Sequence, residues 1–140
     1  MHIRPLHKND INKNYLNLLS QLSAVDNITE QDFLNVFNSL NINYHKIYVI
    51  EHNNNIIASG TLLIEQKFIH QCKCVGHIED IIVDKNYRGN GIGKMLIEYL
   101  ICESQEFNCY KVILNCDESS QLFYQKIGFE SKNMEMSKYF

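Results

Sequence analysis

Residues 76–106 decide the fold, and they read GHIEDIIVDKNYRGNGIGKMLIEYLICESQE. The part from Gly76 to Val83 ends in the apolar run Ile81-Ile82-Val83, which is typical of a strand buried in a sheet. From about Gly91 to Glu106, apolar residues recur at helical spacing. A glycine-rich turn, Arg88 to Lys94, joins the two segments. The stretch therefore predicts a strand, a glycine loop and a helix in that order.

The loop is suited to holding an anion, because glycines let the backbone approach a ligand and a helix N-terminus presents unpaired N–H groups. It does not fit the P-loop motif, since Arg88 occupies the first glycine position and Met95 follows Lys94 where Ser or Thr is required. It also departs from the dinucleotide fingerprint, in which Lys94 would be the last glycine. From these residues alone two interpretations stay open, a pyrophosphate cradle and a turn that only reverses the chain.

The flanking segments predict a mixed sheet covered by helices. Thr29, with Asp32 three residues on, indicates the start of one helix, and Asn9-Asp10 is expected to cap an earlier helix that runs to Leu22. A last helix is expected at Ser119–Ile127. Further strands are expected at His2–Pro5, Ile47–Ile50, Ile56–Glu65, Lys111–Cys116 and Glu130–Met136. The order β-α-α-β-β-β-α-β-α-β indicates the α/β class, an α+β sandwich.

Composition indicates one globular domain over residues 1–140. The chain is 45% hydrophobic and 21% charged, and no Gly/Ser linker interrupts it. A net charge of -3 argues against a nucleic-acid partner. No run approaches the roughly 18 apolar residues that span a bilayer, and the first residues lack a signal-peptide pattern. We therefore expect a cytoplasmic protein that needs neither a membrane nor nucleic acid.

Five cysteines form no regular disulfide framework, and an odd number favours free thiols in a reducing compartment. The only segment with metal-ligand character is Cys72-Lys73-Cys74, which His70 and His77 flank. Structural zinc sites use paired C-x2-C knuckles, which this sequence lacks. We therefore expect no metal.

The loop Arg88-Gly89-Asn90-Gly91-Ile92-Gly93 resembles the [RQ]-x-x-G-x-[GA] pyrophosphate loop of the GNAT N-acetyltransferase superfamily. This resemblance implies the GNAT acyl-CoA N-acyltransferase fold, a mixed central sheet flanked by helices, with acetyl-CoA as co-substrate. In that family the strand before the loop is bulged and lies beside the acetyl-pantetheine. The implied cofactor-binding residues are Asp80, Ile81, Ile82, Val83, Arg88, Gly89, Asn90, Gly91, Ile92, Gly93 and Lys94.

Longer segments resemble one branch of that superfamily, which acetylates D-glucosamine 6-phosphate on the route to UDP-N-acetylglucosamine. The segments that carry this resemblance are Leu22–Thr29, Ile64–His70, Gly76–Ile81, Cys109–Leu114 and Phe123–Phe129. The resemblance implies direct attack of the sugar amine on the thioester, and a homodimer whose sites are completed across the interface. Two alternatives stay open: a GNAT enzyme for another small amine or a protein N-terminus, and a non-catalytic acetyl-CoA sensor.

The same resemblance implies roles for particular residues. Tyr124 would donate a proton to the departing thiolate, and Glu79 would contact the amine or a water that accepts its proton. Alternation along a strand predicts that Glu79 and Asp80 point to opposite faces, so that Asp80 acts through its backbone. The remaining residues implied to contact the sugar phosphate are Ser23, Lys67, Phe68, Ile69 and His70.

Two positions depart from the family pattern. Asn115 stands where relatives carry an acid that orients the amine, and we hypothesise that Asp117 supplies part of the missing charge, since it would share the face of Asn115 if the strand continued. Near the C-terminus, Tyr139 stands about where a relative has a phosphate-binding arginine. Lys138 is the candidate substitute, from its own or from the other subunit.

Overall fold

The computed structural model describes residues 1–140 and contains one mixed sheet in the order β1-β2-β3-β4-β5. Its strands are β1 (His2–Pro5), β2 (His45–His52), β3 (Asn55–Gln66), β4 (Cys74–Val83) and β5 (Cys109–Ile113). Neighbours from β1 to β4 pair antiparallel, whereas β4 and β5 pair parallel. The α4 helix (Ile92–Glu106) makes the crossover that a parallel pair requires. The expected mixed α/β architecture is confirmed.

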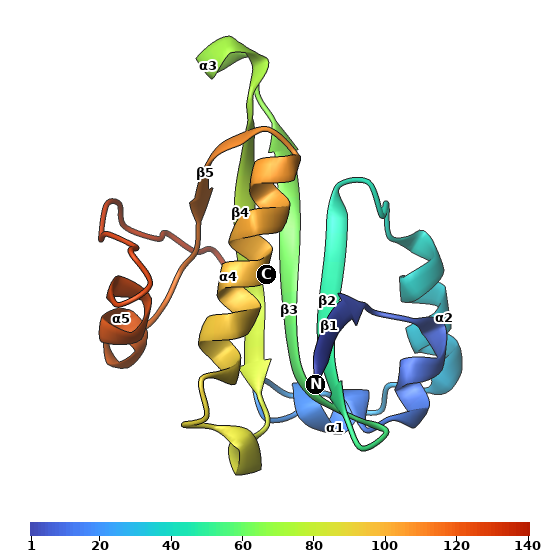
Figure 1. Cartoon of the computed structure of the whole chain (residues 1–140). Coiled ribbons are helices and arrows are strands. Elements are labelled where there is room, and N and C mark those ends of the chain that lie inside the picture. The colour runs from blue at the N-terminus through green and yellow to red at the C-terminus, as the bar shows by residue number, and fades with distance from the viewer.

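Helices cover both faces of this sheet (Figure 1). The long α4 helix lies on one face, and α1 (Tyr15–Leu19) and α2 (Glu30–Ser39) lie on the other. A four-residue segment, α3 (Ile69–Cys72), forms the tip of the β3–β4 hairpin, and α5 (Glu118–Gln125) lies beyond β5. Two short 3-10 turns complete the fold, η1 (Lys8–Asn12) and η2 (Lys85–Tyr87).

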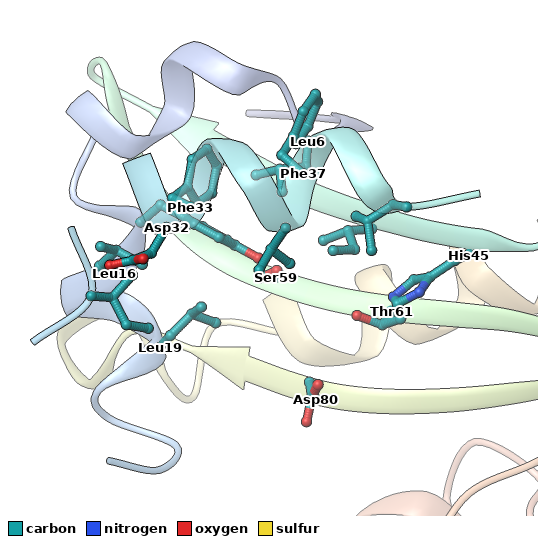
Figure 2. Close-up of a pocket in the computed structure, with 15 residues that line it drawn as sticks. Leu6, Leu16, Leu19, Asp32, Phe33, Phe37, His45, Ser59, Thr61 and Asp80 are labelled. Atoms are coloured by element: carbon teal, nitrogen blue, oxygen red, sulfur yellow. The ribbon is translucent and has the colours of Figure 1, made fainter. Parts of the chain in front are cut away.

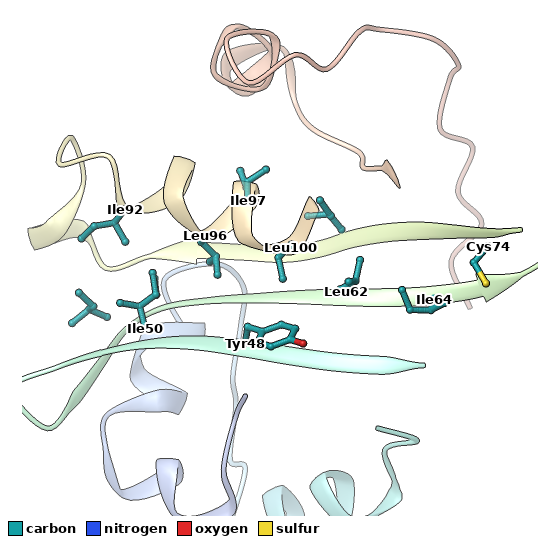
Figure 3. Close-up of a cluster of buried hydrophobic side chains, with 12 residues drawn as sticks. Tyr48, Ile50, Leu62, Ile64, Cys74, Ile92, Leu96, Ile97 and Leu100 are labelled. Atoms are coloured by element: carbon teal, nitrogen blue, oxygen red, sulfur yellow. The ribbon is translucent and has the colours of Figure 1, made fainter. Parts of the chain in front are cut away.

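The α4 face holds the larger core. Leu96 and Leu100 of α4 are fully buried and point toward Leu62 of β3 (Figure 3). Gly60 permits this close approach, because a Cβ there would lie 3.2 Å from a methyl carbon of both Leu96 and Leu100, and 2.6 Å from the Cδ1 atom of Ile81. The helix is also tied to the sheet by the Tyr48 hydroxyl, which donates to Glu103. On the opposite face, a smaller cluster includes Tyr15, Leu18, Phe33, Val49, Ile56 and Ile82.

The N-terminal helices differ in part from expectation. Thr29 caps α2 as expected, in a capping box with Asp32. The helix expected from Asn9-Asp10 to Leu22 is instead two short elements, η1 and α1, separated by the left-handed Asn14 (φ 67°). Asp10 is not its N-cap: its carboxylate is buried in an ion pair with Arg4 and accepts the His7 backbone N–H, so His7 caps the first turn.

The C-terminal region also differs from expectation. Strand β5 ends at Ile113 rather than at Cys116, and Glu130–Met136 forms no strand. Residues from Glu130 to Phe140 are all exposed, with Met134 88% and Met136 91% accessible. A strand needs a neighbour that pairs with its backbone groups, and no edge of this chain's own sheet is paired with the segment. We call residues 130–140 the C-terminal tail.

Candidate active site

The sheet opens between β4 and β5. The two strands pair only from Cys74 to His77 of β4, where His77 lies opposite Ile113. Beyond this point β5 has ended, while β4 continues to Val83 with only β3 beside it. The backbone of residues 78–83 therefore has a free side, on which an extended ligand with amide groups can form strand-like hydrogen bonds.

A β-bulge at Asp80 bends β4 at the opening. Thr61 of β3 pairs with Glu79 and Ser59 pairs with Ile82, so that Asp80 and Ile81 together oppose Gly60. Asp80 has a left-handed backbone (φ 51°), which is uncommon outside glycine and better tolerated by Asp than by most residues. The bulged strand before the loop, which the family resemblance implied, is present.

The bulge overturns one expectation, that Glu79 and Asp80 point to opposite faces. Glu79 lies opposite Thr61, and directly opposed residues of an antiparallel pair share a face. Asp80 lines the same cavity as Thr61 and Ser59, so both acids turn toward the α1 and α2 side. The alternation of side chains between the two faces of β4 is interrupted here, because the bulge adds one residue to the strand.

That cavity, of about 350 Å³, lies between the sheet and the helices α1 and α2 (Figure 2). Its walls are largely apolar, whereas Ser59, Thr61 and Asp80 supply polar groups from the sheet. Tyr15 also lines it, and burial raises the pKa of Tyr15, with the nearby Asp80 carboxylate adding to the effect. The Asp80 carboxylate at the bulge therefore faces this cavity, where it can bind a cationic or hydrogen-bond-donating group of a ligand.

The segment after β4, residues 84–91, is called the cofactor loop here. Asp84 caps η2 by accepting the Asn86 N–H, and the Arg88 Nε donates to the Val83 carbonyl at 2.9 Å. Gly89 (φ 81°) and Gly91 (φ 76°) adopt left-handed conformations that glycine adopts without strain.

The loop delivers an open helix N-terminus. Gly91 is the N-cap residue of α4 and provides no side-chain acceptor, so the first N–H groups of the helix have no side-chain cap. Lys94 is exposed in the first turn and reaches only Glu98, at 3.7 Å. Uncapped N–H groups, the helix dipole and exposed Arg88 and Lys94 together suit a pyrophosphate.

Tyr124 lies on α5, beside the opening. Its half-buried ring packs edge to face with Phe123 at 5.1 Å and with Phe129 at 5.9 Å between ring centroids. Phe123 in turn approaches Gly93, where a Cβ would lie 3.3 Å from the ring, so α5 reaches the start of α4. Burial raises the pKa of Tyr124, with Cys116 and Asp117 adding to it. The phenol therefore keeps its proton near neutral pH and can donate it.

The structure does not support the alternation argument for Asp117. The strand has ended at Ile113, and Asp117 is instead the N-cap of α5, accepting the Ser120 N–H at 2.9 Å and the Ser119 hydroxyl at 3.0 Å. The hydrogen bonds from Ser120 and Ser119 lower the pKa of Asp117. Asn115 is exposed in the link before this cap. An Asp placed just before a helical segment was the available sequence signal for the cap.

Some of the residues implied to contact the sugar phosphate are not gathered at this site within one chain, namely Lys67, Phe68, Ile69, His70 and Lys138. Lys67 directly follows β3, six residues after Thr61 and about 20 Å from it at strand spacing. Its ammonium pairs with Glu65, which also contacts His77. Phe68 and Ile69 are exposed at the hairpin tip, and the His70 ring stacks on Tyr110 at 4.2 Å. Ser23 follows α1, and Lys138 lies in the C-terminal tail near the ring of Phe140.

The cysteines, the possible metal ligands and the helices bear on redox, metal and membrane functions. All five cysteines are free thiols, and no three or more His, Cys, Asp or Glu side chains gather where they could hold a metal ion. None of the helices combines the length and the apolar character that crossing a membrane requires.

A bulged strand that parts from its parallel neighbour, followed by a glycine loop and an open helix N-terminus, defines the acyl-CoA-dependent class of acyltransferases. Residues 14–129 match the Acetyltransferase (GNAT) family, and this chain belongs to that family. The chain is 39% identical to glucosamine 6-phosphate N-acetyltransferase of Arabidopsis thaliana, over 99% of this chain and 95% of that protein. It is 41% identical to glucosamine 6-phosphate N-acetyltransferase 1 of Dictyostelium discoideum, over 97% of this chain and 88% of that protein.

Solved structures agree with this membership. The crystal structure of the Arabidopsis thaliana enzyme superposes with a TM-score of 0.95 at 38% identity, covering 99% of this chain and 97% of that one. An acetyltransferase of Trypanosoma brucei superposes with a TM-score of 0.93 at 34% identity, covering 99% of both chains. The expected fold, family and enzyme class are confirmed.

Proposed function

We propose that this enzyme transfers the acetyl group of acetyl-CoA to the amine of D-glucosamine 6-phosphate, giving N-acetyl-D-glucosamine 6-phosphate and CoA, on the route to UDP-N-acetylglucosamine. The observation that carries this proposal is the near-full-length likeness, at 39% and 41% identity, to the glucosamine 6-phosphate N-acetyltransferases of Arabidopsis thaliana and Dictyostelium discoideum. The free thiols suit a reducing, cytoplasmic location.

The residues present fit acetyl-CoA. The N–H groups at the start of α4, with Gly89, Asn90, Gly91, Ile92 and Gly93, would hold the pyrophosphate, assisted by Arg88 and Lys94. The free side of β4 at Ile81, Ile82 and Val83 would pair with the amides of the pantetheine arm. Acetyl-CoA supplies an activated acyl group, its thioester.

Glu79 and Tyr124 each carry out one of the two proton transfers. The neutral amine attacks the thioester carbonyl, a C–N bond forms, and the C–S bond breaks. Glu79, directly or through a water, accepts the proton that the amine loses, and Tyr124 donates a proton to the departing thiolate. Burial raises the pKa of the half-buried Tyr124, so its phenol holds the proton that this step requires. Backbone N–H groups at the bulge would stabilise the oxyanion.

Acceptor binding involves the groups around the bulge. Asp80 lines the cavity and would attract the ammonium form of the substrate, and the Asn115 amide oxygen would accept a hydrogen bond from the amine. Because Asp117 caps α5, we assign it to holding the helix that carries Tyr124, rather than to the amine.

We propose a homodimer for the remaining contacts. Within one chain Lys67, Phe68, Ile69 and His70 lie at the hairpin tip, away from Glu79, and Lys138 lies in a fully exposed tail. A second copy would cover the exposed apolar side chains of both segments, and would bring cations to the phosphate of the sugar. The exposed residues concerned are Phe68, Ile69, Met134, Met136, Tyr139 and Phe140.

Release of the CoA thiol tests the proposal. The unaltered protein with acetyl-CoA is assayed with glucosamine 6-phosphate, unphosphorylated glucosamine and spermidine. We expect turnover with the sugar phosphate far above that with the other two amines. Equal rates with all three would overturn the acceptor assignment, and CoA binding without release for any amine would favour the acetyl-CoA sensor. The largely apolar cavity keeps a less polar amine or a protein N-terminus as the second candidate acceptor.

A further inference from the structure

One side chain connects the cofactor loop to a segment on the acceptor side of the molecule. Gln21 lies in the turn after α1, within residues 20–28, which we call the acceptor loop. Its Nε2 donates to the Asp84 Oδ2 at 2.9 Å, and its Oε1 accepts the Lys85 backbone N–H at 2.9 Å. One amide group therefore uses both of its ends on two consecutive residues that lie 63 and 64 positions further along the chain.

The Asp84 end of this connection is well fixed. Asp84 is buried, at 8% exposure, and its backbone N–H donates to the Ile57 carbonyl of β3 at 2.8 Å. Its second carboxylate oxygen accepts the Asn86 N–H, so Gln21 provides the partner of the remaining oxygen. The hydrogen bonds from Gln21 and Asn86 lower the pKa of Asp84, which keeps the charged acceptor in place. Hydrogen bonds to a charged group are stronger than neutral ones, and a buried group left without its partner is costly.

The Gln21 end is fixed less firmly. Backbone hydrogen bonds hold the turn, from the Gln21 N–H to the Leu18 carbonyl and from the Ser23 N–H to the Leu19 carbonyl. The side chains of Leu22, Ser23 and Ala24 are exposed. Apart from the two made by Gln21, no hydrogen bond joins residues 20–28 to residues 84–91.

We propose that Gln21 is a positioning residue that couples the two half-sites, so that occupation of the cofactor loop by CoA strengthens acceptor binding through the acceptor loop. The proposal rests on the proposed function for the identity of the acceptor. Asp84 and Lys85 begin the loop that holds the pyrophosphate, and Ser23 follows Gln21 by two residues. An adjustment of Asp84 and Lys85 on cofactor binding is transmitted through the Gln21 amide to Ser23. By thermodynamic linkage, the acceptor strengthens CoA binding by the same factor.

Calorimetric titration of CoA, with and without saturating glucosamine 6-phosphate, measures this coupling, because CoA carries no acetyl group and no reaction occurs. In the unaltered protein we expect the acceptor to tighten CoA binding by about fivefold or more. Gln21→Leu keeps the size of the side chain but removes both hydrogen bonds, and should bring that factor below about twofold. Gln31→Leu is the matched control, since the Gln31 amide reaches only Asn35 on the exposed side of α2. An unaltered protein without coupling, or full coupling in Gln21→Leu, would overturn the proposal.

A charge-swapped pair separates coupling from a merely structural role. Gln21→Glu alone places two carboxylates against each other. Asp84→Asn alone places a second amide NH2 group against that of Gln21, so that two donors face each other. The double variant Gln21→Glu/Asp84→Asn restores the hydrogen bond between the two side chains with donor and acceptor exchanged, and keeps an acceptor for the Lys85 N–H. We expect the double variant to recover the coupling to within about twofold of the unaltered protein. Coupling as weak in the double variant as in the single variants would count against Gln21.

Titration with CoA alone keeps this test independent of the acceptor. Gln21→Leu should weaken CoA binding by about threefold or more, and the charge-swapped pair should restore it. A wrong acceptor would appear as missing thiol release in the unaltered protein. A wrong assignment of Gln21 would appear as equal CoA affinities in the unaltered protein, Gln21→Leu and the charge-swapped pair.

Discussion

At the residue scale, the left-handed Asp80 determines how the acids of the site are arranged. Asp80, with a φ of 51°, is part of the bulge at which Asp80 and Ile81 together oppose Gly60, and this bulge places Glu79 and Asp80 on the same face of the sheet. Two neighbouring carboxylates on one face favour a cationic acceptor, and the free backbone at the bulge favours a carbonyl oxygen. Strained conformations of this kind persist where the surrounding structure holds them, often at functional sites.

The Tyr124 hydroxyl carries the sharpest prediction at this scale. Tyr124→Phe should lower kcat by about 100-fold or more, since it removes the proton donor to the thiolate, while the Kd of acetyl-CoA should stay within about twofold. Steady-state kinetics and calorimetry measure the two quantities. Tyr44→Phe, at a position whose side chain is 51% exposed, should change neither. An unchanged kcat in Tyr124→Phe would refute the assignment.

Asp10 makes a prediction about stability and pH. Burial alone raises the pKa of Asp10, but the hydrogen bonds from Arg4 and His7 outweigh it and hold the pKa below its ordinary value. A lowered folded-state pKa means that the charged group stabilises the fold above its unfolded pKa of about 4, and that this contribution is lost as pH falls through the lower folded value. Asp10→Asn should therefore lower the urea midpoint at pH 7, and the difference from the unaltered protein should narrow below about pH 4.

Urea unfolding at several pH values tests this, with Asp26→Asn in an exposed loop as the control. If the urea midpoint of Asp10→Asn were lower than that of the unaltered protein by the same amount at every pH, the charge of the Asp10 carboxylate would not stabilise the fold.

At the element scale, α5 brings Tyr124 to the opening of the sheet, and a single cap starts this helix. Asp117 accepts the Ser120 N–H, and Phe123, one turn later, approaches Gly93 at the start of α4. The helix has only eight residues, so capping is a large part of its local stability. Any loosening of this helix would move Tyr124, so the proposed role of Tyr124 links this cap to the rate of the reaction.

Two substitutions at Asp117 separate capping from charge. Asn caps a helix about as well as Asp, so Asp117→Asn should keep Tm within a degree or so and leave the KM for the sugar nearly unchanged. Asp117→Ala should cost about 1 kcal/mol, a Tm shift of roughly 3 °C, and should lower kcat. Thermal unfolding and steady-state kinetics give both values. A raised sugar KM in Asp117→Asn would instead support a direct role of the carboxylate charge at the amine.

At the scale of the whole molecule, the chain has apolar surface that its own fold does not cover. The C-terminal tail exposes Met134, Met136, Tyr139 and Phe140, and the hairpin tip exposes Phe68. The tail also has no strand partner in its own sheet, although its sequence resembles a strand. Both features are explained if a second copy of the chain pairs with this region.

Removal of residues 130–140 tests that explanation. We expect the unaltered protein to be a dimer by light scattering, and the shortened chain to be a monomer with at least about tenfold lower kcat/KM for the sugar phosphate, because Lys138 and its neighbours are lost. Circular dichroism controls for folding, since the tail contains no helix or strand of the single chain. A shortened chain that stays dimeric and fully active would refute the role of the tail.

Sequence alone predicted the features whose causes are local. The apolar run Ile81-Ile82-Val83, the glycines of the loop and the Thr29 cap each act within a few residues, and β4, the loop, α4 and α2 form where expected. The family resemblance extended this to acetyl-CoA and to an amino-sugar phosphate, because loop and flanking motifs are short segments that can be matched one by one.

Only the tertiary structure decided the features that depend on distant partners. The bulge that aligns Glu79 with Asp80 arises from the register between β3 and β4, and Asp10 is buried because Arg4 reaches it. The connection from Gln21 to Asp84 joins residues 63 positions apart, which no local pattern encodes. The last strand was wrongly expected because a strand-like sequence describes a segment that can pair, whereas pairing itself requires a neighbour, and no strand of this sheet pairs with the segment.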